Sequence, residues 1–205
     1  KVRTGIGAAR EDVNVSVRGG TRVEIKGVAH IKWIPELTHN EAFRQKSLLM
    51  IREQLLDRVP KPESWVIGWK EIEPNTLAVV PRYIERAVAQ GQKIVAVNLP
   101  RFGSLLSHFT QPGQTFADEI SGRLKVIACL EKPHMLYSEE SIWTEITGGE
   151  RISQLLSSGS EDAQIVFWAP PDDVQTALET IEERCRMAFE GVPNETRKSR
   201  PDGTT

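Results

Sequence analysis

Hydrophobic and polar residues alternate along two neighbouring segments near the start of the chain, within residues 10–28. Valine occupies every second position from Val13 to Val17, and the alternation resumes at Val23 and Ile25 after a Gly-Gly pair. A period of two is typical of β-strands with one buried face and one exposed face. The pattern therefore predicts a two-stranded hairpin.

The loop length decides which polar side chains of this hairpin meet. A loop made by the Gly-Gly-Thr sequence keeps valine opposite valine, with a glycine supplying the positive φ. It would place Ser16 opposite Glu24. It would also place Asn14 opposite Lys26, with Asp12 diagonal to that lysine.

Two carboxylates, an amide, a hydroxyl and an ammonium would then share one face of the hairpin. Such a patch suits a divalent cation together with phosphate oxygens. An alternative interpretation is an ordinary solvated face, in which cross-strand polar pairs only stabilise the sheet.

A helix is predicted next, beginning at a capping box in Thr38–Glu41 and ending before Pro60. Its apolar stripe comprises Leu48, Leu49, Arg52, Leu55, Leu56 and Val59. Its cations, which could meet RNA phosphates or simply be solvated, are Arg44, Lys46, Arg52 and Arg58.

The prolines at 60 and 62 predict a domain boundary, so that residues 1–61 form part of one domain and residues 62–190 a second, separable one. The second domain should contain strands and helices in mixed order. Strands are expected at 65–69, 77–80, 93–99, 124–130 and 164–169. Helices are expected at 81–90, in a short turn from 115 to 122, within 139–156, and after Pro170-Pro171 up to Gly191.

The connections are uneven and no phosphate loop is present, so a parallel α/β sheet is disfavoured. We predict an α+β fold: a hairpin plus helix, interrupted by a two-layer α+β unit that has helices on one face of a mostly antiparallel sheet. Residues 191–205 show polar alternation and a Pro-Asp-Gly turn, which predicts a return to the first domain.

Composition narrows the functional classes. The 26 basic and 28 acidic residues give a net charge of -2, so any RNA contact must be local. No apolar run is long enough for a membrane span, and no export signal is visible. The two cysteines, Cys129 and Cys185, lie in apolar patterns and are expected to be buried, reduced thiols of a cytoplasmic protein.

One loop, residues 101–114, mixes aromatic and cationic residues with two glycines. Arg101, Phe102 and His108 are its candidates for contact with single-stranded RNA. The alternative is a compact loop whose Phe102, Leu105, Leu106 and Phe109 are packed inside.

Several segments together resemble a known family. They are TGIG with the REDVNVSV and RVEIKGV strands of the hairpin, PRFGSLL, QPG, EGVPNETRK and PDGTT. These segments resemble those of the tRNA-dependent amidotransferase family, which comprises the B and E subunits, and they are closer to the archaeal E type. The resemblance spans nearly the whole chain.

The resemblance implies a cradle-like catalytic domain that uses ATP and Mg²⁺ to phosphorylate the glutamate of Glu-tRNA(Gln). Amidation follows, with ammonia released by an asparaginase-like partner, the D subunit. Residues 62–190 would be the insertion domain (GAD domain) shared with bacterial aspartyl-tRNA synthetases. The chain opens on Lys1 without an initiator methionine, and we expect an inactive fragment whose remaining metal ligands lie upstream.

The family resemblance implies a role for each polar residue on this face of the hairpin. Asp12 and Glu24 would face the metal, and both, with Lys26, would be catalytic. Phosphate or ATP would meet Arg10, Asn14, Ser16 and Lys26. The competing hypothesis is a docking module for tRNA or protein at about residues 60–190, with no chemistry of its own.

Overall fold

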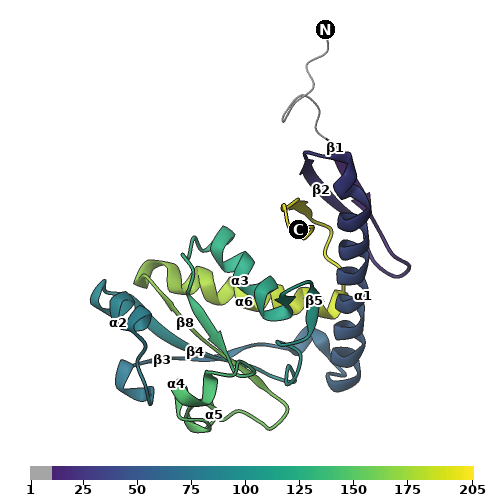
Figure 1. Cartoon of the computed structure of the whole chain (residues 1–205). Helices are drawn as coiled ribbons and strands as arrows, with labels where there is room; N and C mark the ends of the chain where they lie inside the picture. The colour runs from purple at the N-terminus through teal and green to yellow at the C-terminus, as the bar shows by residue number, and fades with distance from the viewer. Residues whose placement is uncertain (1–10) are drawn as a thin grey trace.

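A computed structural model describes residues 11–205 (Figure 1). Its helices are α1 (Ile34–Arg58), α2 (Arg82–Ala89), α3 (Phe116–Ile127), α4 (Trp143–Thr147), α5 (Arg151–Leu156) and α6 (Val174–Glu190). Its strands are β1 (Glu11–Val15), β2 (Val23–Val28), β3 (Gly68–Ile72), β4 (Lys93–Leu99), β5 (Phe109–Gln111), β6 (Gln114–Thr115), β7 (Met135–Tyr137), β8 (Ala163–Ala169) and β9 (Thr196–Lys198).

The central sheet has the order β3-β4-β8-β7, and every neighbouring pair is antiparallel. This confirms the predicted α+β class and the mostly antiparallel sheet. Strands β4 and β8 are buried along almost their whole length, because side chains on both of their faces are covered.

Helices cover both faces of this sheet, so a third layer adds to the two that were expected. Alternate residues of β4 and β8 on one face pack against α3 and α6. The residues between them, including Ile94 and Val166, pack against α2, α4 and α5. In Figure 1, α3 and α6 lie above β3, β4 and β8, and α4 and α5 lie below them.

Helix α1 runs beside the hairpin and also joins the core of the central unit. Its residues Leu48, Ile51 and Leu55 belong to the same buried cluster as the α3 and α6 side chains. The core thus continues across the boundary expected near residue 61. The division into domains stays a prediction.

The start of α1 differs from the prediction. The helix begins at Ile34, and Thr38 lies inside it with its hydroxyl donating to the carbonyl oxygen of Ile34 at 2.8 Å. The capping box is therefore wrong, because Pro35 at the first turn starts the helix instead. Leu56 is exposed, which leaves Leu48, Ile51 and Leu55 as the buried stripe.

The strand expected at 124–130 is also wrong, because α3 continues through Gly122 to Ile127 and residues 128–130 form no strand. Ala117, Ile120, Leu124 and Ala128 recur at helical spacing and are buried, whereas Val126 and Ile127 face outward. A similar correction applies at 65–69, where the strand begins only at Gly68, and at 77–80, where none forms.

The cysteine prediction holds for Cys185 but is wrong for Cys129. Both thiols are free, and Cys129 is exposed just after α3, in the left-handed conformation with φ 55°. Cys185 is buried against the core, and burial raises the pKa of its thiol to about 12.

A thiol reagent should therefore label Cys129 rapidly at neutral pH and leave Cys185 unmodified until the protein unfolds. Mass spectrometry of native and denaturant-treated samples checks this, with Cys129→Ser as the control that should abolish native labelling. Rapid labelling of native Cys129→Ser would contradict the buried position of Cys185.

Candidate functional site

The tail strand β9 completes the sheet that carries the hairpin. Strand β2 pairs antiparallel with β1 on one side and parallel with β9 on the other. The tail thus pairs with the hairpin, while its assignment to the first domain stays a prediction. The Pro-Asp-Gly turn is formed, with the Gly203 amide donating to the Arg200 carbonyl at 3.2 Å. Figure 1 shows the C-terminal tail beside the hairpin.

Register places the polar residues of the three strands on one face. Asn14 pairs with Glu24 across the hairpin, and Glu24 and Lys26 pair with Thr196 and Lys198 of the tail. Registered partners point to the same side of a sheet. The opposite side carries Val13, Val15, Val23 and Ile25, which pack toward the interior.

A cavity of about 520 Å³ opens at this polar face. It is lined by Asp12, Lys26, Gly27, Thr196, Arg197 and Lys198. Beside it, the ammonium of Lys26 lies 3.6 Å from a carboxylate oxygen of Glu24, which also accepts a hydrogen bond from the Thr196 hydroxyl at 3.3 Å. The cavity thus collects carboxylate, hydroxyl and ammonium groups from three strands.

The hairpin register differs from the prediction by two residues. Valine still faces valine, but Asn14 rather than Ser16 lies opposite Glu24. The strands end early because the side-chain oxygen of Gln45 on α1 accepts the Val17 amide at 3.0 Å, and its nitrogen donates to the Val15 carbonyl at 3.1 Å. Ser16 therefore sits in the connecting loop and is exposed.

The other hairpin candidates are placed as follows. Asp12 lies at a bulge between the Glu11 and Val13 pairs and borders the cavity next to Lys26. Asn14 accepts a hydrogen bond from Arg22 at 3.2 Å. Arg10 lies outside the described residues. Within residues 11–205, no group of three or more His, Cys, Asp or Glu side chains is arranged to hold a metal ion.

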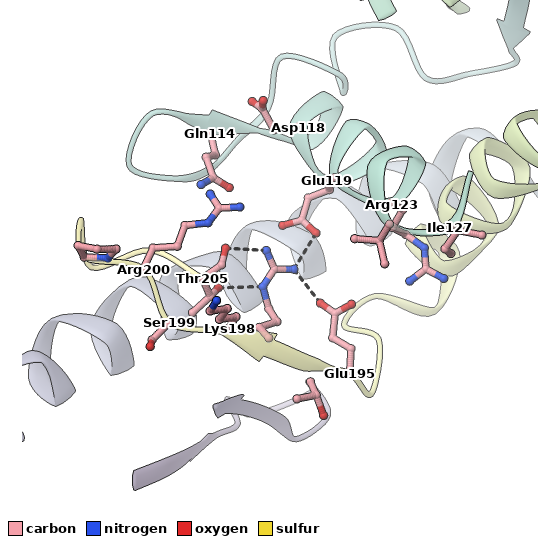
Figure 2. Close-up of a pocket in the computed structure, with 15 residues that line it drawn as sticks. Gln114, Asp118, Glu119, Arg123, Ile127, Glu195, Lys198, Ser199, Arg200 and Thr205 are labelled. Atoms are coloured by element: carbon pink, nitrogen blue, oxygen red, sulfur yellow. Dashed lines mark hydrogen bonds and ion pairs between the residues drawn. The ribbon is translucent and has the colours of Figure 1, made fainter. Parts of the chain in front are cut away.

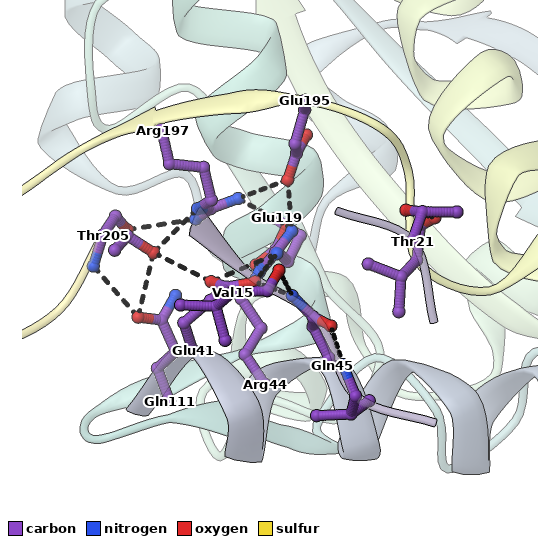
Figure 3. Close-up of polar contacts among 12 residues, drawn as sticks. Val15, Thr21, Glu41, Arg44, Gln45, Gln111, Glu119, Glu195, Arg197 and Thr205 are labelled. Carbon is purple, nitrogen blue, oxygen red and sulfur yellow. Dashed lines mark hydrogen bonds and ion pairs between the residues drawn. The ribbon is translucent and has the colours of Figure 1, made fainter. Parts of the chain in front are cut away.

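Behind this sheet lies a buried cluster of charges that sequence reasoning missed (Figure 3). Arg44 of α1 is completely buried and donates to both carboxylate oxygens of Glu119 on α3, at 2.7 and 2.9 Å. It also contacts Glu41 at 3.1 Å and Glu195 at 2.5 Å. Arg44 therefore cannot reach RNA, which corrects its place among the phosphate-facing cations.

Glu119 is the common acceptor of this cluster. Its carboxylate receives Arg44, Arg184 at 3.4 Å and Arg197 at 3.2 Å. Burial by itself would raise the pKa of Glu119, but the guanidinium groups, Arg44 first, outweigh it and hold the pKa well below its usual value. Three arginines face Glu41, Glu119 and Glu195, so the formal charges balance.

The pKa values of two arginines in this cluster, Arg44 and Arg184, shift in opposite directions. Burial works against the charge of Arg44, yet Glu119 and the other carboxylates raise its pKa. Arg184 packs its guanidinium over the Phe116 ring at 4.7 Å, and burial lowers its pKa. Arg44 is thus the best-compensated charge in the interior.

Arg197 links the cluster to the polar face. Its guanidinium donates to the hydroxyl and the carbonyl of Thr205 at 2.8 and 3.0 Å, and to Glu195 at 2.9 Å, in addition to Glu119 (Figure 3). A second cavity of about 590 Å³ lies between β9 and α3 on this side, where Arg123 and Arg200 contribute cations (Figure 2).

The RNA candidates in the loop at 101–114 separate into buried and exposed residues. Phe102 has no exposed surface and packs on Trp65, Phe116 and Phe189, so it belongs to the core and has no face for a base. Arg101 is exposed, with a φ of 66° and an ion pair to Glu161.

His108 is partly buried, and this burial lowers its pKa. Leu105 and Leu106 are fully buried like Phe102, as the compact-loop alternative expected, whereas Phe109 is 48% exposed. The guanidinium of Arg58, another candidate for RNA contact, is held by two hydrogen bonds that it donates to the carbonyls of Arg101 and Gly103 at 3.0 and 2.8 Å.

Taken together, the fold and the polar face define a class: a mixed α/β protein in which a three-stranded sheet carries carboxylate, amide, hydroxyl and ammonium groups on one face. The family is shown by comparison. The GatB/GatE catalytic domain matches residues 1–204, and the chain belongs to this family.

Similar proteins of known name agree with this family assignment. Over the whole chain it is 33% identical to the E subunit of glutamyl-tRNA(Gln) amidotransferase from Pyrococcus abyssi and 34% identical to that from Methanopyrus kandleri. The corresponding protein of Pyrococcus furiosus is 35% identical. The chain spans about a third of the length of these curated relatives, 32% in each case. In residues 11–205, no helix is long and apolar enough to cross a membrane.

Proposed function

We propose that this chain carries part of the phosphoryl-transfer site of an ATP-dependent glutamyl-tRNA(Gln) amidotransferase. ATP would phosphorylate the γ-carboxyl of the glutamate on Glu-tRNA(Gln). Ammonia from an asparaginase-like partner, the D subunit, would then displace phosphate to give Gln-tRNA(Gln) in the cytoplasm. The observation that carries the proposal is the cavity at the polar face, where Asp12, Lys26 and the tail strand meet.

The chemistry of the face suits phosphoryl transfer. This reaction needs fixed positive charge where negative charge develops on the phosphate, and little covalent help from the protein. Lys26 supplies an ammonium, and Glu24 keeps it in place at 3.6 Å. Asn14 orients neighbouring groups through its amide, while Ser16 and Arg10 stay proposed phosphate contacts of the adjoining segments.

Magnesium fits only in part. Asp12 and Glu24 offer two carboxylates, and Mg²⁺ normally needs about six oxygen ligands, several of them water or phosphate. We therefore propose only that Asp12 and Glu24 would be the carboxylates of this chain that face the ion. Its chemical contribution would be to neutralise phosphate oxygens.

For residues 62–190 we propose the insertion domain shared with bacterial aspartyl-tRNA synthetases. A docking role for tRNA is favoured by one observation, the exposed loop that holds Arg101 with a positive φ. The side chain of Asp162 fixes this backbone by accepting the Arg101 amide at 3.0 Å. Arg101 and His108 are the contacts we propose, and Phe109 is the exposed aromatic side chain of that loop.

The proposal is tested in the whole enzyme with its asparaginase-like partner. Asp12→Ala and Glu24→Ala should each lower tRNA-dependent phosphate transfer from ATP by about a hundredfold or more, because charge stabilisation in the transition state is lost. Binding of tRNA should change less than about twofold, since neither carboxylate attracts RNA.

Asp57→Ala and Glu53→Ala are matched controls, because both residues are exposed on α1. They should leave the rate unchanged. Wild-type transfer rates in both Asp12→Ala and Glu24→Ala would rule out the polar face as the site. If this chain were needed for tRNA binding but not for phosphate transfer, the hypothesis of a docking module without chemistry would stand instead.

A further inference from the structure

We infer that Lys198 is a second phosphate-binding ammonium of this site, and that Arg197 is the positioning residue that sets it there. The inference rests on the function proposed above. It assigns a role to the tail strand β9, which pairs with the hairpin from the far end of the chain.

Register places Lys198 directly beside Lys26. The two residues are paired in the parallel β2–β9 ladder, so their side chains share the polar face. The backbone is held at this point, because the Ser199 amide donates to the Lys26 carbonyl at 3.1 Å and the Ser199 hydroxyl donates to the Gly27 carbonyl at 2.9 Å. Lys198 therefore reaches the same 520 Å³ cavity as Lys26 and Asp12.

Arg197 fixes which side chains of β9 face outward. Its guanidinium is anchored on the inner side to Glu119, Glu195 and Thr205, as Figure 3 shows. Since side chains alternate along a strand, an inward Arg197 places Thr196 and Lys198 outward. A slip of one residue would move Lys198 to the interior and break every contact of Arg197.

The two lysines differ in their charge partners. Lys26 has Glu24 at 3.6 Å, whereas Lys198 has no ion-pair partner among residues 11–205. An anion that binds an ammonium without such a partner does not compete with a carboxylate of this chain. A volume of 520 Å³ lies within the range of about 300–1,000 Å³ typical of small-ligand sites. The ligand class is a polyphosphate, as in a nucleoside triphosphate.

Lysine on an edge strand can also serve only to discourage strand pairing between molecules. That role and phosphate binding differ in what they predict. A protective lysine affects solubility and leaves nucleotide kinetics unchanged, whereas a phosphate ligand affects the KM for ATP.

The experiment uses the full-length enzyme with its asparaginase-like partner and measures KM for ATP, KM for Glu-tRNA and kcat. Lys198→Ala should raise KM for ATP about tenfold, the scale of one charge-assisted hydrogen bond. KM for Glu-tRNA should stay within about twofold of the wild-type value, because RNA affinity depends on many phosphate contacts. Lys198→Arg should recover most of the ATP affinity, since it keeps the charge.

Arg197→Lys tests the positioning role. It keeps the charge but loses the fork of donors that holds Thr205 and Glu119, so KM for ATP should again rise. In the double variant with Lys198→Ala the rise should be no larger than for Lys198→Ala alone, because Arg197 acts through Lys198. Additive effects would overturn the positioning role.

Lys125→Ala, which replaces an exposed lysine of α3, is the matched control and should leave all three constants unchanged. Wild-type KM for ATP in Lys198→Ala, while Glu24→Ala still abolishes transfer, would overturn this inference and leave the proposed function standing. Wild-type behaviour of both variants would instead overturn the proposed function.

Discussion

Glu119→Ala should destabilise the chain by about 3–5 kcal/mol, enough to unfold a protein of ordinary stability. The carboxylate of Glu119 compensates Arg44, Arg184 and Arg197 at distances of 2.7 to 3.4 Å, and its side chain is almost completely buried. Without it, three guanidinium groups face two carboxylates in the interior. Urea or thermal unfolding followed by circular dichroism measures the loss.

Glu183→Ala is the matched control for this prediction. Glu183 also pairs with an arginine, Arg123 at 2.8 Å, but its side chain is 53% exposed. An exposed pair contributes about 0–1 kcal/mol, so this variant should unfold close to the wild type. Equal losses in the two variants would show that burial of the cluster has no energetic weight.

The pH dependence of stability follows from the same carboxylate. Because the folded-state pKa of Glu119 lies well below its ordinary value of 4.5, its contribution is present in full above that value. It is lost as pH falls from 4.5 through the lower folded-state pKa. The wild type should therefore lose stability in this acidic range more steeply than Glu119→Gln, provided that this variant folds.

The strongest sequence patterns predicted the elements that hold the fold together. Strands β4 and β8 are continuous apolar runs, and α6 has an apolar stripe that ends at a glycine, so both features were visible locally. In contrast, α3 was divided because Gly122 resembles a stop signal and β-branched residues follow it. Packing of Leu124 and Ala128 in the core shared with α6, which no local pattern encodes, decides that this segment is helical.

The candidate site was predictable in its residue types but not in its register. Alternation correctly placed Asp12, Asn14, Glu24 and Lys26 on one face. The shift of two residues depends on Gln45, a side chain 28 residues from Val17 that captures its amide. The sequence shows the polar alternation that contains Lys198. It does not show that this segment pairs with β2.

The burial of the arginines is the largest feature that the sequence patterns did not predict. Arg44 lies on a helix among other charged residues, and in sequence it is indistinguishable from a solvated cation. Its partners Glu119 and Glu195 are 75 and 151 residues away, so the cluster exists only in the folded chain. This cluster joins α1, α3 and the tail, and it thereby fixes the strand that completes the polar face.

Phe102→Ala should cost about 3–5 kcal/mol of stability, the usual penalty for removing a buried phenylalanine. The ring has no exposed surface, and its centroid lies 5.2, 6.2 and 6.1 Å from those of Trp65, Phe116 and Phe189. Truncation would leave a cavity between α3, α6 and the segment that leads into β3. Chemical denaturation of this chain gives the free energy of unfolding directly.

Phe109→Ala is the control, since its ring is 48% exposed in the same loop region and contacts Phe43 at a centroid distance of 5.9 Å. It should cost less than about 1 kcal/mol, because little apolar surface leaves the interior. A milder core variant, Phe102→Leu, then separates packing from RNA contact in the whole enzyme. Because no part of the Phe102 ring reaches the surface, tRNA affinity of folded Phe102→Leu should equal that of the wild type. A loss of tRNA affinity by about tenfold or more in that folded variant, with Phe109→Ala silent, would mean that the loop opens to expose Phe102 when RNA binds.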